Sequence, residues 1–263
     1  MFRQAFAVFG GCVPSSDFRG WRFAVPAKRQ YRRRVGVSVR GARCGDALLL
    51  NAPASSMPSP RRMLVLQDAL EIADAAVRDE VGSALDRIAE RTGIVIEPVR
   101  FSEIVGEACE LKVCNLNGLR DLQTAEFQST VGNWIEACKP ELGFTFSMAY
   151  GNVQRFDRIA ALDNMARCES LFRQINAFFT PETVICFPTT PKIAPRKDSL
   201  NTLEAVMDFY DPTMTITAFS GVARLPEISV PLLTVDNCPV GLSFVAGHYQ
   251  DEFLLSAVKR IIS

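Results

Sequence analysis

The sequence has very few of the residues from which metal sites and histidine-dependent catalytic centres are built. Only one of its 263 residues is histidine, His248, and none of its eight cysteines forms a Cys-x-x-Cys pair. Zinc sites need clusters of these residues, and no glycine-rich phosphate loop is present, so the sequence predicts no metal and no cofactor. His248 follows Gly247 in a segment typical of a turn, which predicts a loop histidine rather than a member of a catalytic triad. We expect free, mostly buried thiols in a reducing compartment.

Long apolar runs are also missing. No stretch approaches the roughly 18 uncharged residues that a membrane span requires, and Arg19 and Arg22 interrupt any apolar start of a secretory signal. These absences predict a soluble, cytoplasmic protein with no membrane partner. An organelle is the alternative location, because the N-terminus is rich in arginine.

The net charge of zero hides an uneven distribution. Residues 1–62 contain twelve Lys/Arg and two acidic residues, whereas residues 63–263 contain 17 Lys/Arg and 27 Asp/Glu. With its Pro/Ser run at 52–60, this arrangement predicts a basic, largely disordered N-terminal extension (1–62) and one folded domain (63–263). Three origins for the extension remain open: a non-native start from gene truncation or a frame shift, a transit peptide, and a nucleic-acid-binding arm. We expect no nucleic-acid partner, since no recognisable binding motif accompanies the arginines.

From residue 63 the pattern predicts an α/β fold. Met63–Leu66 is a short apolar strand, a helix follows Asp74 and ends at Thr92-Gly93, and Ile94–Ile96 supplies a second strand. Such a β–α–β unit favours parallel pairing. Further helices are expected over 101–136, over 150–178 and from Asp251, and further strands at 183–187, 228–230 and 240–245. The apolar stripe of the helix over 150–178 consists of Phe156, Ile159, Leu162, Met165, Phe172 and Ile175.

Three stretches then carry a resemblance to a known family. They are a strand that breaks into a proline-rich loop (Ile185–Pro195), a turn into a strand (Ser220–Pro231), and Pro239–Val245 followed by Asp251–Leu255. Together, in this order, they resemble the C-terminal part of the amidase signature family. The looser match around Glu126 and Trp134 is similar to the indole-3-acetamide hydrolase type of amidase. The resemblance implies an α/β fold with a partial mixed sheet flanked by helices.

The resemblance also implies a substrate-binding loop. In the family, the loop that corresponds to Pro188–Pro195 lies near the acyl side of the substrate, which points to Thr189, Thr190 and Pro191 as substrate-binding residues. Ligands in open α/β sheets lie at the carboxyl ends of strands, and the prolines hold this loop extended. We expect it to lie beside Gly221–Pro231 as one wall of a cleft. The alternative is a rigid connector with capping threonines.

The catalytic residues of the family have no counterpart in the sequence. Amidase signature enzymes use a Lys–Ser–Ser arrangement, and the nearest imitation, Gly10–Ser16, lacks its closing glycines and an upstream lysine. Arg224 also stands where relatives usually have glycine. We therefore expect no catalytic residue here and an amidase part that is inactive alone. A non-catalytic small-molecule or partner-binding module and one half of a split amidase remain the alternatives. The predicted partners are a small amide if a catalytic half completes the site, and a second copy of the chain through an exposed sheet edge.

Overall fold

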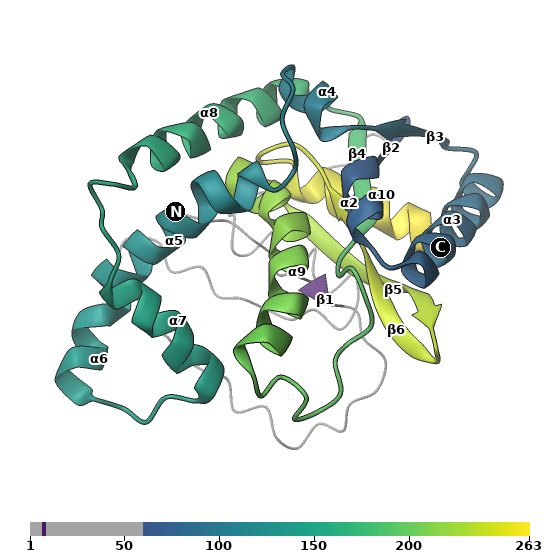
Figure 1. Ribbon diagram of the computed structural model, residues 1–263. Helices are drawn as coiled ribbons and strands as arrows, with labels where there is room; N and C mark the ends of the chain where they lie inside the picture. The colour runs from purple at the N-terminus through teal and green to yellow at the C-terminus, as the bar shows by residue number, and fades with distance from the viewer. Residues whose placement is uncertain (1–6, 9–59) are drawn as a thin grey trace.

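The computed structural model describes residues 7–8 and 60–263, which form a mixed sheet flanked by helices (Figure 1). The sheet order is β1-β5-β6-β4-β2-β3. Its strands are β1 (Ala7–Val8), β2 (Arg62–Leu66), β3 (Val95–Val99), β4 (Thr183–Pro188), β5 (Glu227–Val235) and β6 (Cys238–Val245). The pairs β1–β5, β2–β3 and β2–β4 are parallel, whereas β6 runs antiparallel to both β4 and β5. The predicted fold class is confirmed.

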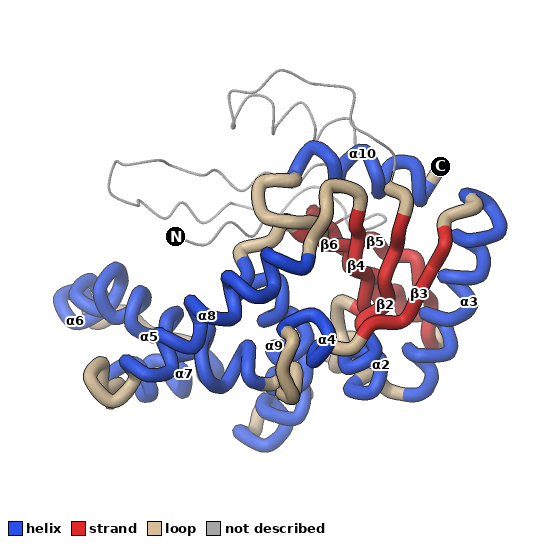
Figure 2. The backbone as a smooth tube through the Cα atoms, turned by 90° about the horizontal axis from the view of Figure 1, so that it is seen from above, coloured by secondary structure: helices blue, strands red, loops and turns tan. Residues whose placement is uncertain are grey.

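Helices cover both faces of this sheet, and a group of them extends away from one end (Figure 2). They are α2 (Gln67–Ile72), α3 (Ala75–Thr92), α4 (Phe101–Val105), α5 (Arg120–Phe127), α6 (Asn133–Cys138), α7 (Phe144–Gln154), α8 (Leu162–Phe178), α9 (Leu203–Ala223) and α10 (Asp251–Ile262), with π-helical segments η1 (Asn115–Leu119) and η2 (Gln128–Gly132) on either side of α5. Helices α5, α6 and α7 form the outlying group. No helix in the described part of the chain is long and apolar enough to cross a membrane.

The β–α–β unit forms as its periodicity predicts. Asp74 occupies the N-cap position of α3, although its side chain makes no capping hydrogen bond, and Gly93 ends the helix with a φ of 69°. Such a left-handed C-terminal residue favours glycine because a Cβ atom would crowd the following carbonyl. Strands β2 and β3 then pair in parallel with Met63 opposite Ile96.

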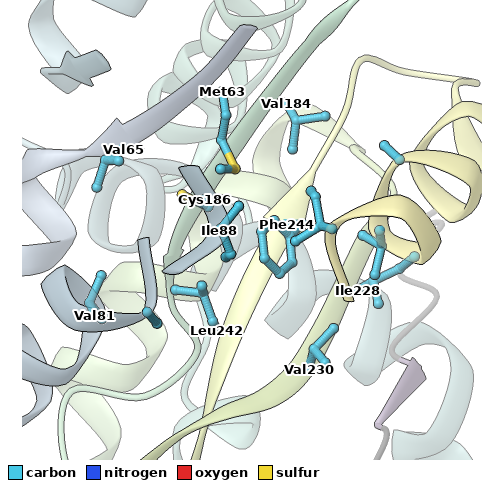
Figure 3. Packing of buried hydrophobic residues seen from close by; sticks show 14 of the residues in the cluster. Met63, Val65, Val81, Ile88, Val184, Cys186, Ile228, Val230, Leu242 and Phe244 are labelled. Carbon is cyan, nitrogen blue, oxygen red and sulfur yellow. The ribbon is translucent and has the colours of Figure 1, made fainter. Parts of the chain in front are cut away.

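Each face of the sheet has its own hydrophobic core, because side chains alternate along each strand. On one face, Met63, Cys186, Ile228 and Phe244 pack against α3 and α10 (Figure 3). On the other face, α4, α8 and α9 bury a cluster whose large members include Phe101, Phe187, Phe219, Leu64, Leu66, Leu171 and Ile175. The central strands are therefore covered by hydrophobic side chains and helices on both faces.

The expected single helix over 150–178 is wrong. The structure has two helices, α7 and α8, joined by residues 155–161. The side chain of Asp157 accepts hydrogen bonds from the backbone N–H groups of Ile159 and Ala160, at 2.9 and 3.2 Å, and so forms a turn in place of a helix. As a result, Ile159 and Leu162 are 80% and 57% exposed, and only the later part of the predicted stripe reaches the core.

Helix α9 has no counterpart among the sequence expectations. It begins after Thr202, whose side-chain oxygen accepts the backbone N–H of Ala205, and it continues through Pro212. Its C-terminal half lies against the sheet, where Phe219 makes edge contacts with Phe101 and Phe187. Ser220–Ala223, predicted to be part of a turn, form the last turn of this helix.

Most of the predicted N-terminal extension, 1–62, lies outside the described residues. Two short parts of it are described. Ala7–Val8 forms β1 beside Ile228 and Ser229, and Arg62 already belongs to β2, one residue before the predicted start of the domain.

Candidate functional site

Thr189 lies where β4 ends and the proline-rich loop begins. Its backbone N–H donates to the carbonyl of Gly241 on β6 at 2.8 Å. Its hydroxyl oxygen lies 2.6 Å from Ser229 Oγ on β5 and 2.8 Å from Ser243 Oγ on β6. Three strands thus bring three hydroxyl groups together at the carboxyl end of β4, where open α/β sheets place their ligands.

These hydroxyl groups connect to a buried carboxyl group, that of Glu227. Ser243 Oγ donates to Glu227 Oε1 at 2.7 Å, and Ser220, in the last turn of α9, contacts Glu227 Oε2. Strand pairing explains the arrangement, because Ser229 lies opposite Ser243 and Glu227 lies two residues earlier on the same face of β5. The polar cluster therefore lies on the face that α9 covers.

Burial raises the pKa of the Glu227 carboxyl group above its usual range, against the opposing effect of the hydrogen bonds from Ser220 and Ser243. The residue is only 1% exposed, and Ser220 and Ser243 are fully buried. Placing a carboxylate here is costly, since the low-dielectric surroundings disfavour the charged form.

Gly241 allows the cluster to close. A Cβ atom at this position would lie 2.3 Å from Ser229 Oγ and 2.6 Å from Thr189 Oγ1. Both distances are far below van der Waals contact. The two hydroxyl groups meet over Gly241 because this residue has no side chain.

The other two predicted substrate-binding residues have local structural partners. Thr190 Oγ1 donates to the carbonyl of Lys192 at 3.0 Å, within the loop. The carbonyl of Pro191 accepts the backbone N–H of Asp74 at 2.8 Å and so fixes the start of α3. These contacts are those of a rigid connector, the alternative that the sequence left open for this loop.

The expected shared wall forms only in part. Ser229 reaches Thr189, but Glu227 is level with Ile185, near the beginning of β4. Because β4 and β5 run in the same direction, Pro226 lies toward the opposite end of the strands from Thr190. The segment Gly221–Pro226 therefore does not flank the proline-rich loop, and that part of the expectation is wrong.

The sequence expectations did not single out Glu227, Ser220, Ser229 or Ser243, although all four lie within the stretches that carry the family resemblance. The available signal was a glutamate and a serine two positions apart, Glu227 and Ser229, at the start of a run that is otherwise apolar. In a strand this spacing puts both on one face. That pattern predicts a buried polar pair and could have drawn attention to the position.

Arg224 adopts a backbone conformation that usually favours glycine. As the C-cap residue of α9 it has a φ of 54° and a ψ of 37°, the left-handed region. Its guanidinium group lies 4.4 Å from the centre of the Phe172 ring and 3.2 Å from a carboxylate oxygen of Glu169. These contacts offset a backbone conformation that costs a residue with a Cβ atom about 1 kcal/mol.

We expect Arg224→Gly to unfold with a free energy about 1 kcal/mol higher than that of Arg224→Ala. Both variants lose the contacts to Phe172 and Glu169, and only glycine avoids the Cβ strain. Urea unfolding of the two variants side by side measures the difference. Equal stabilities would show that the left-handed conformation carries no strain here.

The basic groups near the site are engaged elsewhere. His248 Nδ1 lies 2.8 Å from the carbonyl oxygen of Arg224, in a loop as predicted. Lys192 Nζ lies 2.5 Å from a carboxylate oxygen of Asp208. Across the described residues, no hydrogen bond joins a serine, threonine or cysteine side chain to the side chain of a lysine or histidine. The same part of the chain contains no cluster of potential metal ligands. Burial raises the pKa of the Cys186 thiol to about 12.

Comparison with known proteins places this geometry in a family. The chain is 22% identical to Translocon at the outer membrane of chloroplasts 64 from Pisum sativum over 95% of this chain and 43% of that protein. It is 31% identical to indoleacetamide hydrolase from Pseudomonas syringae pv. syringae over 38% of this chain and 22% of that protein. The chain thus spans less than half the length of these curated relatives.

A solved amidase structure has the same fold, with a TM-score of 0.61 at 18% identity over 86% of this chain and 50% of that one. The amidase family profile matches residues 63–255, which include the β–α–β unit and every member of the polar cluster. The resemblance noted from the three sequence stretches is therefore confirmed. This chain belongs to the amidase family.

Proposed function

We propose that this chain supplies part of an amide-binding site in an amidase-type hydrolase and does not hydrolyse simple amides by itself. A second half that carries the nucleophile and its base would complete the enzyme. The polar group that the chain offers to such an assembly is the hydroxyl of Thr189, with Thr190 and Pro191 holding the loop in place. The substrate class is carboxylic amides, and the choice among them depends on the completing half.

One observation carries this proposal. The hydroxyl groups at the carboxyl end of β4 bond to one another and to Glu227, and not to a lysine or histidine. A hydroxyl nucleophile needs an adjacent base that removes its proton, and the side chains bonded to the Thr189 hydroxyl are those of two serines, Ser229 and Ser243. Thr189 is therefore better suited to bind a substrate than to attack it.

We expect no measurable release of ammonia from indole-3-acetamide or benzamide when the purified chain is assayed alone. Addition of the N-terminal half of the indoleacetamide hydrolase from Pseudomonas syringae is the complementation test, with that half alone as its control. Turnover by the lone chain that a single Ser→Ala substitution abolishes would contradict the proposal.

A non-catalytic binding module is the second candidate function. It is favoured by the relative that covers 95% of this chain, whose name places it in a translocon at the outer membrane of chloroplasts. On this reading, the fold holds a partner instead of a substrate, and the organellar location becomes the preferred one over the cytoplasm. Import or envelope association with isolated pea chloroplasts, together with failure of the complementation test, would favour this candidate. Complemented turnover would favour the hydrolase.

A further inference from the structure

The hydrogen bonds around Glu227 have a fixed direction, because a hydroxyl group has only one proton to donate. Ser220 Oγ contacts Glu227 Oε2 and also lies 3.1 Å from the carbonyl oxygen of Thr217. One proton cannot serve both acceptors. If Oε2 is protonated, it donates to Ser220, and Ser220 donates to Thr217. A neutral Glu227 thus satisfies both contacts at the same time.

The limit of one proton per hydroxyl group also sets the direction of the hydrogen bonds on the Oε1 side of the carboxyl group. Ser243 uses its proton on Glu227 Oε1, so it must accept the proton of Thr189. Thr189 in turn accepts the proton of Ser229. All protons point from Ser229 toward Glu227. The direction is unchanged when Glu227 is ionised, because Oε1 is an acceptor in both states.

The outer end of this series of hydrogen bonds, at Thr189 and Ser229, is therefore rich in acceptors. After these bonds are made, Thr189 and Ser229 have unused oxygen lone pairs and no unused hydroxyl proton. The backbone N–H of Thr189 is also occupied, by the carbonyl of Gly241. Thr189 is half-buried, whereas Ser229, Ser243 and Glu227 are buried. A ligand that reaches this point meets acceptors, which suit an N–H group and repel a carboxylate.

We propose that Thr189 and Ser229 form a recognition site for an N–H donor, the NH₂ group of a primary carboxamide, and that Glu227, acting through Ser243, is the positioning residue that fixes its polarity. The inference rests on the proposed function, since it specifies which part of an amide the site binds. It also assigns a role to a carboxyl group that the proposed hydrolysis does not use. The site would distinguish an amide from the acid that its hydrolysis releases.

Benzamide and benzoate are suitable probes because they differ only in the group that meets the hydroxyls. We expect benzamide to shift the ¹³C-methyl NMR signal of Thr189 with a Kd on the order of 1 mM, and benzoate to bind at least about tenfold more weakly. The Thr189 signal is assigned by its loss in Thr189→Val. Equal affinity for the two probes, or no shift with either, would overturn the recognition site.

Two matched variants test the role of Glu227 as a positioning residue. Ser243→Ala and Ser220→Ala each remove one buried hydroxyl bonded to Glu227, but only Ser243 lies between Glu227 and Thr189. Without Ser243, the Thr189 proton is free to point outward, so the preference for benzamide should fall to about threefold or less. Ser220→Ala should keep the full preference. A purely structural role predicts the same effect for both variants and would refute the positioning role.

The binding measurement and the activity measurement can fail separately. Complemented turnover together with equal binding of the two probes would reject the recognition site and leave the proposed hydrolase in place. Selective benzamide binding without complemented turnover would reject the proposed hydrolase and keep the recognition site. The site would then belong to a module that binds amides without cleaving them.

Discussion

Replacing Gly241 by alanine is expected to lower the free energy of unfolding by about 3 kcal/mol. The new methyl group would lie 2.3 Å from Ser229 Oγ and 2.6 Å from Thr189 Oγ1, so at least one of these side chains must move. Overpacking of a tight site costs about 1–3 kcal/mol, and a buried hydroxyl group that loses its partner adds about 1–3 kcal/mol. Urea unfolding measures the sum.

Gly82→Ala is the matched control. Gly82 lies on the exposed side of α3, and a Cβ atom there would meet nothing within 4 Å. Alanine in a helix interior is more favourable than glycine by about 0.5–1 kcal/mol, so this variant should be slightly more stable than the parent. If both variants changed stability in the same direction, the close contacts at Gly241 would not be the cause.

Local periodicity was sufficient to predict most of the sheet. The β–α–β unit follows from apolar spacing between Met63 and Ile96, and the buried strand at 183–187 follows from its β-branched and aromatic residues. The mixed pairing of the sheet could be expected only from the family resemblance. The periodicity of apolar residues along the chain does not specify which strands pair in the sheet.

The errors arose where one side chain overrides a periodic pattern. Asp157 ends a helix by bonding to the backbone two and three residues ahead, although the apolar residues around it continue at helical spacing. Helix α9 contains Pro212, which normally marks a helix boundary, yet the buried contacts of Phe219 stabilise the helix beyond it. A local side-chain hydrogen bond decides the first case, and tertiary packing decides the second.

The polar cluster illustrates the same limit at the candidate site. Thr189 was predicted from the proline-rich loop, but its side-chain partners come from β5 and β6, and Glu227 has a further partner on α9, all distant in sequence from the loop. Whether Glu227 is buried and hydrogen-bonded depends on all three elements at once. A sequence pattern can place Glu227 and Ser229 on one face, but it cannot supply Ser243 and Ser220.

Stability should fall as the pH rises above about 4.5, and Glu227→Gln should remove this dependence. The pKa of Glu227 is raised in the folded protein by burial, whereas in the unfolded chain it stays near its ordinary value of 4.5. Between these two values the folded state holds a proton that the unfolded state has released. Stability from this group is thus fully present below pH 4.5 and is lost as the pH rises through the folded pKa.

The expected slope is about 1.4 kcal/mol per pH unit within that window, because one proton is linked to folding. Glutamine can accept from Ser243 and donate to Ser220, so it keeps both hydrogen bonds without an ionisable group. Free energies of unfolding measured in urea at a series of pH values above 4.5 should therefore diverge up to the folded pKa, with Glu227→Gln increasingly the more stable protein.

Glu71→Gln is the control for this measurement. Glu71 is exposed, and its hydrogen bond and charge interaction with Arg100 lower its pKa below 4.5, so its titration has the opposite sign and ends before the window begins. Its pH dependence above pH 5 should match that of the parent. Parallel curves for the parent and Glu227→Gln would mean that Glu227 is ionised in the folded protein. The hydrogen bond from Ser220 to Thr217 would then be lost, while the hydrogen bonds from Ser229 through Thr189 and Ser243 to Glu227 would keep their direction.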